Sequence, residues 1–263
     1  MKITIFQQSH IKPKDPQFSA FCKKFPKQTL IVLGEYVLNP FFHTLVTLSS
    51  KQILQHSIAQ INYLEQLAKK HSISFFAPII MGESTRLIKQ LVFIDGTTKS
   101  EPLFYTQQKL IGYEHWNEAG FFANPKVKNF KDPFLFRYCG FTIAGLFGFE
   151  IHFDELWLKL KKAGVDMVLL PTANTFGSYE RWRELCKMRA FLNGCMIVRA
   201  NRVGKLAIEN QEWEFYGDSL IAMPNGEIID WLGEGEEILS LEIEKEEITK
   251  IALEWGFRQK YTP

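Results

Sequence analysis

The sequence predicts an α/β fold, in which strands and helices alternate along the whole chain. Short apolar runs rich in β-branched residues, such as Thr29–Leu33, predict buried strands. Amphipathic stretches such as Lys51–His71 predict helices between them, because their apolar residues recur at three-residue spacing. No Pro- or Ser-rich linker and no internal repeat interrupts the alternation. We therefore expect one domain over residues 1–263.

Ten segments have the short apolar character of strands. In chain order they are Lys2–Phe6, Thr29–Leu33, Ser74–Ile80, Leu87–Ile94, Phe134–Phe136, Thr142–Phe147, Met167–Leu170, Met196–Asn201, Gly217–Ala222 and Glu227–Ile229. Two connections contain the turn dipeptides Asp95-Gly96 and Asn225-Gly226, which predict β-hairpins.

Two further helices are expected in the second half of the chain. His152–Ala163 and Ser178–Asn193 are each followed directly by a glycine, which is common just after a helix. The charged stretch Glu242–Trp255 predicts an outer helix, or an arm that crosses a dimer partner.

Composition and charge exclude several classes of function. The chain has 263 residues, with 31 Lys and Arg against 29 Asp and Glu, so its net charge of +2 argues against a nucleic-acid-binding protein. No apolar run approaches the roughly 20 residues of a membrane-spanning helix, and the N-terminal residues do not resemble a signal peptide. The four cysteines form no CxxC pair and have no metal-like spacing with the six histidines. We expect a cytoplasmic protein with reduced thiols, no membrane partner, no metal and no cofactor.

Three segments place polar residues or a sharp turn directly after predicted strands. Glu35 ends the run Leu30–Leu33, where partial burial would raise the pKa of a carboxyl group toward general-base use. Lys109 precedes Glu118 by nine residues and could stabilise an oxyanion, although each of these charges could also be an ordinary surface group. The segment 143–156 predicts a strand, a sharp turn and a helix, and a nucleophile is expected at the apex of that turn. Gly148 occupies the apex instead.

Taken together, these segments resemble the nitrilase superfamily of carbon–nitrogen hydrolases over nearly the whole chain. Further tracts continue the pattern, namely Leu170-Pro171-Thr172-Ala173, Arg189-Ala190, Ala200-Asn201-Arg202-Val203-Gly204, Phe215-Tyr216-Gly217-Asp218-Ser219 and Pro224-Asn225-Gly226-Glu227. The resemblance implies a nitrilase-like four-layer α-β-β-α sandwich of two mixed sheets. It also implies a Glu–Lys–Cys site that acts on a small-molecule amide, carbamoyl compound or nitrile.

The resemblance assigns roles to individual residues. Glu35 would relay protons, and Lys109 together with the backbone N–H of Phe149 would stabilise the oxyanion. Glu118 would be an additional carboxylate that positions the substrate, and Ala173 and Asn174 would form the substrate-contacting wall. The resemblance also implies a homodimer or higher homo-oligomer, formed through the helices His152–Ala163 and Ser178–Asn193.

The sequence departs from this pattern at Gly148, where the family has its nucleophilic cysteine. Cys139 lies nine residues earlier, before the predicted strand, and Cys22, Cys186 and Cys195 lie in other segments, so none is a credible substitute. Gly148 is either an introduced change or a natural loss, and the sequence leaves both open. We expect an amidase that is inactive as written. The alternatives are a pseudoenzyme that serves as a binding or assembly module, and slow hydrolysis by a water molecule that Glu35 activates.

Overall fold

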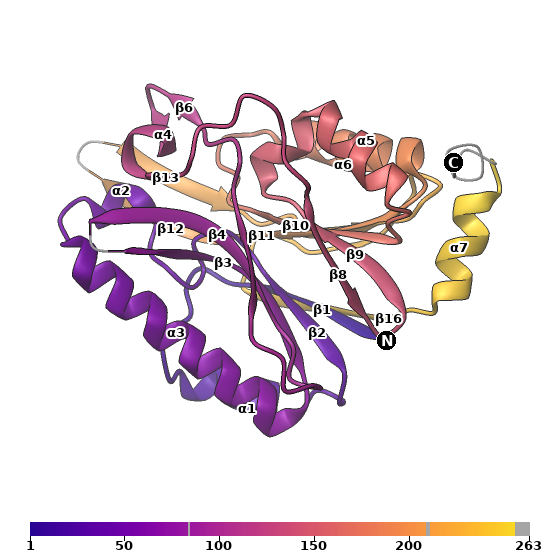
Figure 1. Ribbon diagram of the computed structural model, residues 1–263, viewed down its shortest axis with the longest axis horizontal. Coiled ribbons are helices and arrows are strands. Elements are labelled where there is room, and N and C mark those ends of the chain that lie inside the picture. The colour runs from indigo at the N-terminus through magenta and orange to yellow at the C-terminus, as the bar shows by residue number, and fades with distance from the viewer. Residues whose placement is uncertain (84, 209–210, 256–263) are drawn as a thin grey trace.

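The computed structural model describes residues 1–83, 85–208 and 211–255. Two six-stranded sheets pack face to face, and helices cover the outer face of each sheet (Figure 1). The four layers therefore follow one another as α-β-β-α, which confirms the predicted sandwich.

The first sheet has the strand order β16-β1-β2-β3-β4-β5. Its strands are β1 (Lys2–Gln7), β2 (Thr29–Leu33), β3 (Ser74–Glu83), β4 (Arg86–Ile94), β5 (Leu103–Thr106) and β16 (Glu237–Glu242). The neighbours β1, β2 and β3 are parallel, whereas β16, β4 and β5 each pair antiparallel with a neighbour.

The second sheet repeats this design with the order β15-β14-β11-β10-β9-β8. Its strands are β8 (Phe134–Tyr138), β9 (Phe141–Gly145), β10 (Met167–Thr172), β11 (Met196–Asn201), β14 (Leu220–Ala222) and β15 (Ile228–Trp231). Here β9, β10 and β11 are parallel and the remaining strands are antiparallel to their neighbours.

Apolar side chains fill each of the three spaces between the four layers. Residues of both sheets, such as Phe76 and Ile143, form the core between the sheets. The helices α1 (Pro16–Cys22) and α3 (Ser50–His71) pack against the first sheet, and α5 (Asp154–Lys162) and α6 (Tyr179–Asn193) pack against the second. The strands of the parallel groups are buried on both faces, which explains why they read as continuous apolar runs.

Smaller elements gather at the end of the sandwich where the parallel strands finish. They are α2 (Phe42–Leu45), β6 (Gly112–Tyr113), β7 (Trp116–Asn117), α4 (Glu118–Phe121), the 3-10 turn η1 (Gly148–His152) and the hairpin β12 (Val203–Ile208) with β13 (Gln211–Tyr216). The helix α7 (Lys245–Leu253) lies at the edge of the molecule away from α2, α4 and β6 (Figure 1). No helix in the described ranges is long and apolar enough to cross a membrane.

Three local expectations differ from the structure. The Asn225-Gly226 hairpin is confirmed, but Asp95-Gly96 opens a longer loop between β4 and β5, because the Asp95 carboxylate accepts hydrogen bonds from Thr97 and Thr98. The predicted strand Gly217–Ala222 begins only at Leu220, since Gly217 and Asp218 have φ angles of 72° and 61°. The predicted helix His152–Ala163 begins at Asp154, after the 3-10 turn.

Candidate active site

The carboxyl ends of β2, β9, β10 and β11 meet where the two sheets are in direct contact. The Glu35 N–H donates to the Thr172 carbonyl at 3.1 Å, and the Arg202 N–H donates to the same oxygen at 3.1 Å. A Cβ atom at Gly34 would lie 3.0 Å from the Arg202 nitrogen, which is tighter than an ordinary contact, so the close approach of the sheets favours glycine there. This contact holds Glu35 against the end of the second sheet.

A buried ammonium lies between two buried carboxylates at this end of the sandwich. The Lys89 ammonium donates to Glu35 Oε2 and, at 2.6 Å, to Glu118 Oε1, and the Tyr36 hydroxyl also donates to Glu118 Oε1. Lys89 is 2% exposed, Glu35 6% and Glu118 0%. Charges so well removed from water are stable only when they are paired, and each of these carboxylates is paired with Lys89.

The environment shifts the pKa values of this cluster. Burial raises the pKa of Glu35, and repulsion from Glu118 adds to the rise, whereas the Lys89 ammonium opposes it. Burial alone would lower the pKa of Lys89, but the attraction of Glu118 and Glu35 outweighs burial and raises it. Lys89 is therefore held in its charged form, while Glu35 is a carboxyl group that binds a proton more readily than an ordinary glutamate and is suited to general-base use.

The ammonium comes from a different strand than the sequence predicts. The Lys109 ammonium donates to the Val127 carbonyl at 3.1 Å and lies 5.5 Å from the ring centre of Phe130, so it takes no part in the carboxylate cluster. Lys109 follows β5, the edge strand of the first sheet. The expectation that Lys109 is the lysine of the site with Glu35 and Glu118 is corrected accordingly, and Lys89 is the residue that sequence reasoning missed.

Lys89 did leave a signal in the sequence. In the alternating strand β4, Leu87, Lys89, Leu91 and Phe93 share the buried face, and a lysine at such a position needs a partner inside the protein. Asn124 holds this part of the strand, because it accepts from the Lys89 N–H at 2.8 Å and donates to the Lys89 carbonyl at 3.0 Å.

Gly148 lies directly against Glu35. Its N–H donates to Glu35 Oε1 at 3.2 Å, as the first residue of the 3-10 turn that follows β9. Its φ is not positive, so the backbone would accept any residue, but a Cβ atom would lie 2.8 Å from Thr172 Cγ2 and 3.2 Å from Glu35 Oε1. The Thr172 methyl group therefore closely restricts the space into which a side chain at position 148 would extend.

The four cysteines lie in other parts of the fold. Cys139 is exposed at the turn before β9, and therefore at the opposite end of that strand from Gly148. Cys195 precedes β11, Cys186 is buried in α6, and Cys22 is buried at the end of α1. The described residues thus bring no thiol to the carboxylate cluster, and no group of three or more metal-binding side chains occurs among them.

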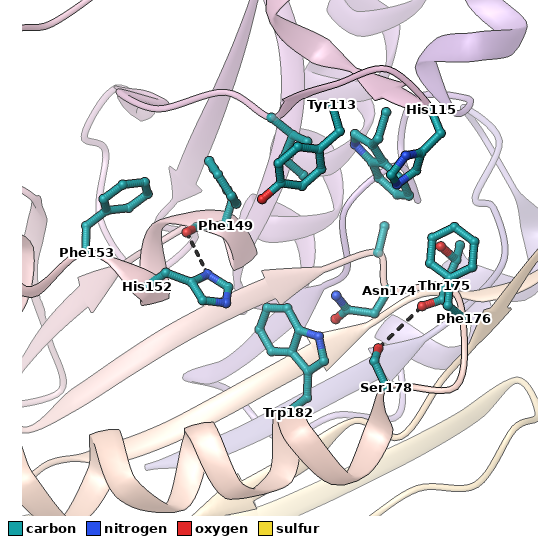
Figure 2. Close-up of a pocket in the computed structure, with 13 residues that line it drawn as sticks. Tyr113, His115, Phe149, His152, Phe153, Asn174, Thr175, Phe176, Ser178 and Trp182 are labelled. Atoms are coloured by element: carbon teal, nitrogen blue, oxygen red, sulfur yellow. Dashed lines mark hydrogen bonds between the residues drawn. The ribbon is translucent and has the colours of Figure 1, made fainter.

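A cavity of about 520 Å³ opens beside Gly148, because Phe149, the next residue, lies on its wall (Figure 2). Ala173 also lines this cavity. Its other lining residues are Ile111, Tyr113, His115, Trp116, His152, Phe153, Asn174, Thr175, Phe176, Ser178 and Trp182. The structure thus places the predicted wall residues Ala173 and Asn174 at one cavity with Phe149. Glu35, Lys89 and Glu118 are not among the lining residues.

A fully buried arginine positions the Asn174 side chain. Arg199 Nη2 donates to Asn174 Oδ1 at 2.9 Å, and Arg199 Nη1 donates to the Asp218 carbonyl at 2.9 Å. The Asn174 N–H also donates to Asn201 Oδ1 at 2.9 Å. Asn174 is thereby held from both its main chain and its side chain.

Most of this sequence matches one known protein family. The model of the carbon–nitrogen hydrolase family matches residues 20–252. This chain belongs to the carbon–nitrogen hydrolase family. The resemblance to the nitrilase superfamily is thereby confirmed.

The carbon–nitrogen hydrolase also resembles characterised amidases in sequence. It is 29% identical over 153 residues to the N-carbamoylputrescine amidase of Oryza sativa subsp. japonica, a match that covers 53% of this chain and 50% of that protein. It is 23% identical over 197 residues to the 2-oxoglutaramate amidase of Bacillus subtilis, covering 72% and 69%. The chain thus spans about half the length of the first of these relatives.

Solved structures share the fold of this carbon–nitrogen hydrolase. An amidase mutant from Nesterenkonia AN1 superposes with a TM-score of 0.76 at 19% identity, covering 99% of this chain and 93% of that one. A CN-hydrolase superfamily protein from Xanthomonas campestris, with an arsenic adduct in its active site, gives 0.78 at 16% identity, covering 99% and 96%. Another structure of the Nesterenkonia amidase shows acrylamide added to its active-site cysteine.

Proposed function

We propose that this carbon–nitrogen hydrolase binds a small amide or N-carbamoyl compound in the cavity beside Gly148 and does not hydrolyse it through a covalent thioester. The observation that carries the proposal is the contact between Gly148 and Glu35. The proton-accepting carboxylate, the ammonium and the second carboxylate are assembled, but position 148 offers them only a backbone N–H.

The choice of an amide rests on the relatives. Those with a named substrate include amidases of N-carbamoylputrescine and of 2-oxoglutaramate. Both names describe a small molecule with a terminal carboxamide or carbamoyl group. A nitrile is the chemically related alternative, and it belongs in the same test.

The geometry indicates how the site would work if a thiol stood at position 148. Glu35, whose pKa is raised, would take the thiol proton and deliver it to the leaving ammonia. The backbone N–H of Phe149 would stabilise the negative charge that develops on the carbonyl oxygen, and the Lys89 ammonium would hold Glu35 in position. Glu118 would hold Lys89 in place. Loss of a covalent nucleophile lowers turnover by on the order of 10⁶-fold. We therefore expect this chain, with glycine at position 148, to show no detectable hydrolysis of amides.

The test is ammonia release from a panel of short amides, N-carbamoyl compounds and nitriles. Because the Thr172 methyl group would lie 2.8 Å from a new Cβ, Gly148→Cys is combined with Thr172→Ser, which removes the methyl group and keeps the hydroxyl group. That hydroxyl is needed because it donates to Asn201 Oδ1 at 2.8 Å. Thr172→Ser alone is the matched control.

We expect the double variant to release ammonia. The original chain and the single Thr172→Ser variant should release none. Hydrolysis by the original chain at a comparable rate would overturn the proposal. Silence of all three proteins, with the fold retained by circular dichroism, would show that the pocket no longer accepts such substrates.

A second candidate is slow hydrolysis by a water molecule activated by Glu35. It is favoured by the raised pKa of Glu35 and by the absence of a side chain between its carboxylate and the backbone of Gly148. A low rate in the original chain that disappears in Glu35→Gln would support it. A low rate that Glu35→Gln leaves unchanged would exclude it.

We also propose that the chain forms a homodimer through α5 and α6. These helices expose large apolar side chains at Leu158 (57%), Tyr179 (45%), Met188 (48%) and Leu192 (47%). Large apolar side chains exposed on neighbouring helices are a feature of many interfaces. Light scattering should give twice the chain mass, and Met188→Glu with Leu192→Glu should give the monomer mass. A monomer before substitution would contradict the proposal.

A further inference from the structure

The cavity beside Gly148 is lined without a charged side chain. Among the residues that the structure describes, its wall contains no Asp, Glu, Lys or Arg. Six aromatic side chains, from Tyr, Trp and Phe residues, and two histidines make up most of the surface. A volume of about 520 Å³ lies within the usual range for small-molecule sites, so the cavity can hold an aromatic amide of modest size.

The buried charges of the site are paired with one another and do not line this cavity. Lys89 is bound between Glu35 and Glu118, and Arg199 is bound by Asp218. A charged ligand group would therefore lose its hydration without gaining an opposite charge, and an isolated ion in an apolar site is costly. The site favours ligands that bring no charge of their own.

Asn174 provides a directed hydrogen-bond donor in the same cavity. Because Arg199 donates to Asn174 Oδ1 at 2.9 Å, the orientation of the carboxamide is determined, and its nitrogen is turned away from Arg199. Figure 2 shows this nitrogen directed into the space between His152 and Trp182. A neutral carbonyl oxygen of a ligand is the natural acceptor for this N–H.

We propose that the cavity selects uncharged, flat amides. The ligand carbonyl accepts a hydrogen bond from Asn174 Nδ2, and the apolar part of the ligand packs among Phe149, Phe176 and Trp182. This inference rests on the proposed function and narrows its substrate class. It separates the chain from relatives named for N-carbamoylputrescine, which carries an amine, and 2-oxoglutaramate, which carries a carboxylate.

Calorimetric titration of the purified, original chain at about pH 8 tests the selectivity without any need for turnover. The probes are phenylacetamide, which is neutral and carries a flat phenyl ring, succinamate, which carries a carboxylate, and N-carbamoylputrescine, which carries an amine. Phenylacetamide should bind at least about tenfold more tightly than either charged probe, which corresponds to about 1.4 kcal/mol. Equal or tighter binding of a charged probe would overturn the inference.

Two substitutions test the named contacts. Asn174→Ala should weaken phenylacetamide binding about tenfold, the scale of one directed hydrogen bond. The control Asn129→Ala, on an exposed loop away from the cavity, should leave binding unchanged. His152→Arg, at an exposed position on the wall, should improve succinamate binding at least about fivefold by supplying the missing positive charge.

An unchanged affinity in both Asn174→Ala and His152→Arg would overturn the inference, because the cavity would then not be the binding site. Binding of no probe would overturn the inference together with the binding half of the proposed function. Tight binding of a charged amide that the double variant Gly148→Cys/Thr172→Ser also hydrolyses would overturn the inference alone.

Discussion

Removal of the Lys89 ammonium should destabilise the fold far more than removal of any other lysine charge considered above. In Lys89→Met the side chain keeps its approximate length, but Glu35 and Glu118 lose the cation that lies between them. Two carboxylates would then share a site in which both are almost completely buried. The matched control is Lys109→Met, because Lys109 is half-buried and its ammonium has one hydrogen bond, to the Val127 carbonyl.

The magnitude follows from the burial of the partners. Loss of one member of a buried ion pair typically costs about 3 to 5 kcal/mol. For a domain of this size, about 2 to 4 °C of Tm is lost per kcal/mol, so the midpoint should fall by about 6 to 20 °C. Lys109→Met should cost no more than about 1 kcal/mol, the scale of one ordinary hydrogen bond.

The effect of Lys89→Met should also depend on pH. Without the ammonium, burial and repulsion from Glu118 raise the folded-state pKa of Glu35 further above its unfolded value. A group of this kind stabilises the fold at low pH, and that stability is lost as the pH rises through the folded pKa. The variant should therefore lose less stability at about pH 5 than at about pH 8.

Urea unfolding followed by circular dichroism at both pH values measures these differences. If Lys89→Met and Lys109→Met lose the same stability, or if the loss is larger at the lower pH, the central role of Lys89 in the buried cluster would be refuted.

Three further predictions concern other parts of the same end of the fold. Burial raises the pKa of Glu150 to about 7, so stability should fall by up to about 3 kcal/mol between about pH 5 and pH 8, and urea midpoints of Glu150→Gln should lack this dependence. A flat profile for the original chain would contradict it. Gly34→Ala should cost about 1 to 3 kcal/mol, since its Cβ would lie 3.0 Å from a main-chain nitrogen of the other sheet, whereas Gly177→Ala, with open space around it, should cost little in the same assay. Equal midpoints for the two glycine variants would argue against the tight contact between the sheets. Tyr36→Phe should cost about 2 kcal/mol of unfolding free energy, because it removes the buried hydroxyl that donates to Glu118, and an unchanged midpoint would show that this hydrogen bond adds nothing.

Much of the fold could be predicted from the sequence because the parallel strands are buried on both faces. Runs such as Leu30–Leu33 and Met167–Leu170 are uniformly apolar for that reason, and their positions are confirmed. The hairpin β12–β13 was missed because only part of its surface is buried, so it contains no continuous apolar run of the kind that marks the parallel strands. The left-handed residues Gly217 and Asp218 shortened a predicted strand that hydropathy alone could not have bounded.

The candidate site was harder to predict, because it depends on which strands are neighbours. Glu35 and Glu118 were identified as site residues, and the structure brings them together around one ammonium. Separation along the chain could not show which lysine supplies that ammonium. Lys89 belongs to β4 and reaches Glu35 across the first sheet. Lys109 is closer to Glu118 in sequence, but its ammonium donates to the Val127 carbonyl instead.

The most direct test of the central claim is to measure covalent labelling at position 148. Phenylacetamide is mixed with each of three proteins, which are the original chain, Thr172→Ser and Gly148→Cys/Thr172→Ser. Each reaction is quenched in acid, and the intact mass of the protein is measured by mass spectrometry. The account predicts one phenylacetyl group on the double variant and none on the other two proteins, because Glu35, Lys89 and the cavity are in place and only the thiol is missing. A phenylacetyl group on the original chain, or a double variant that folds and binds phenylacetamide but is never acylated, would contradict it.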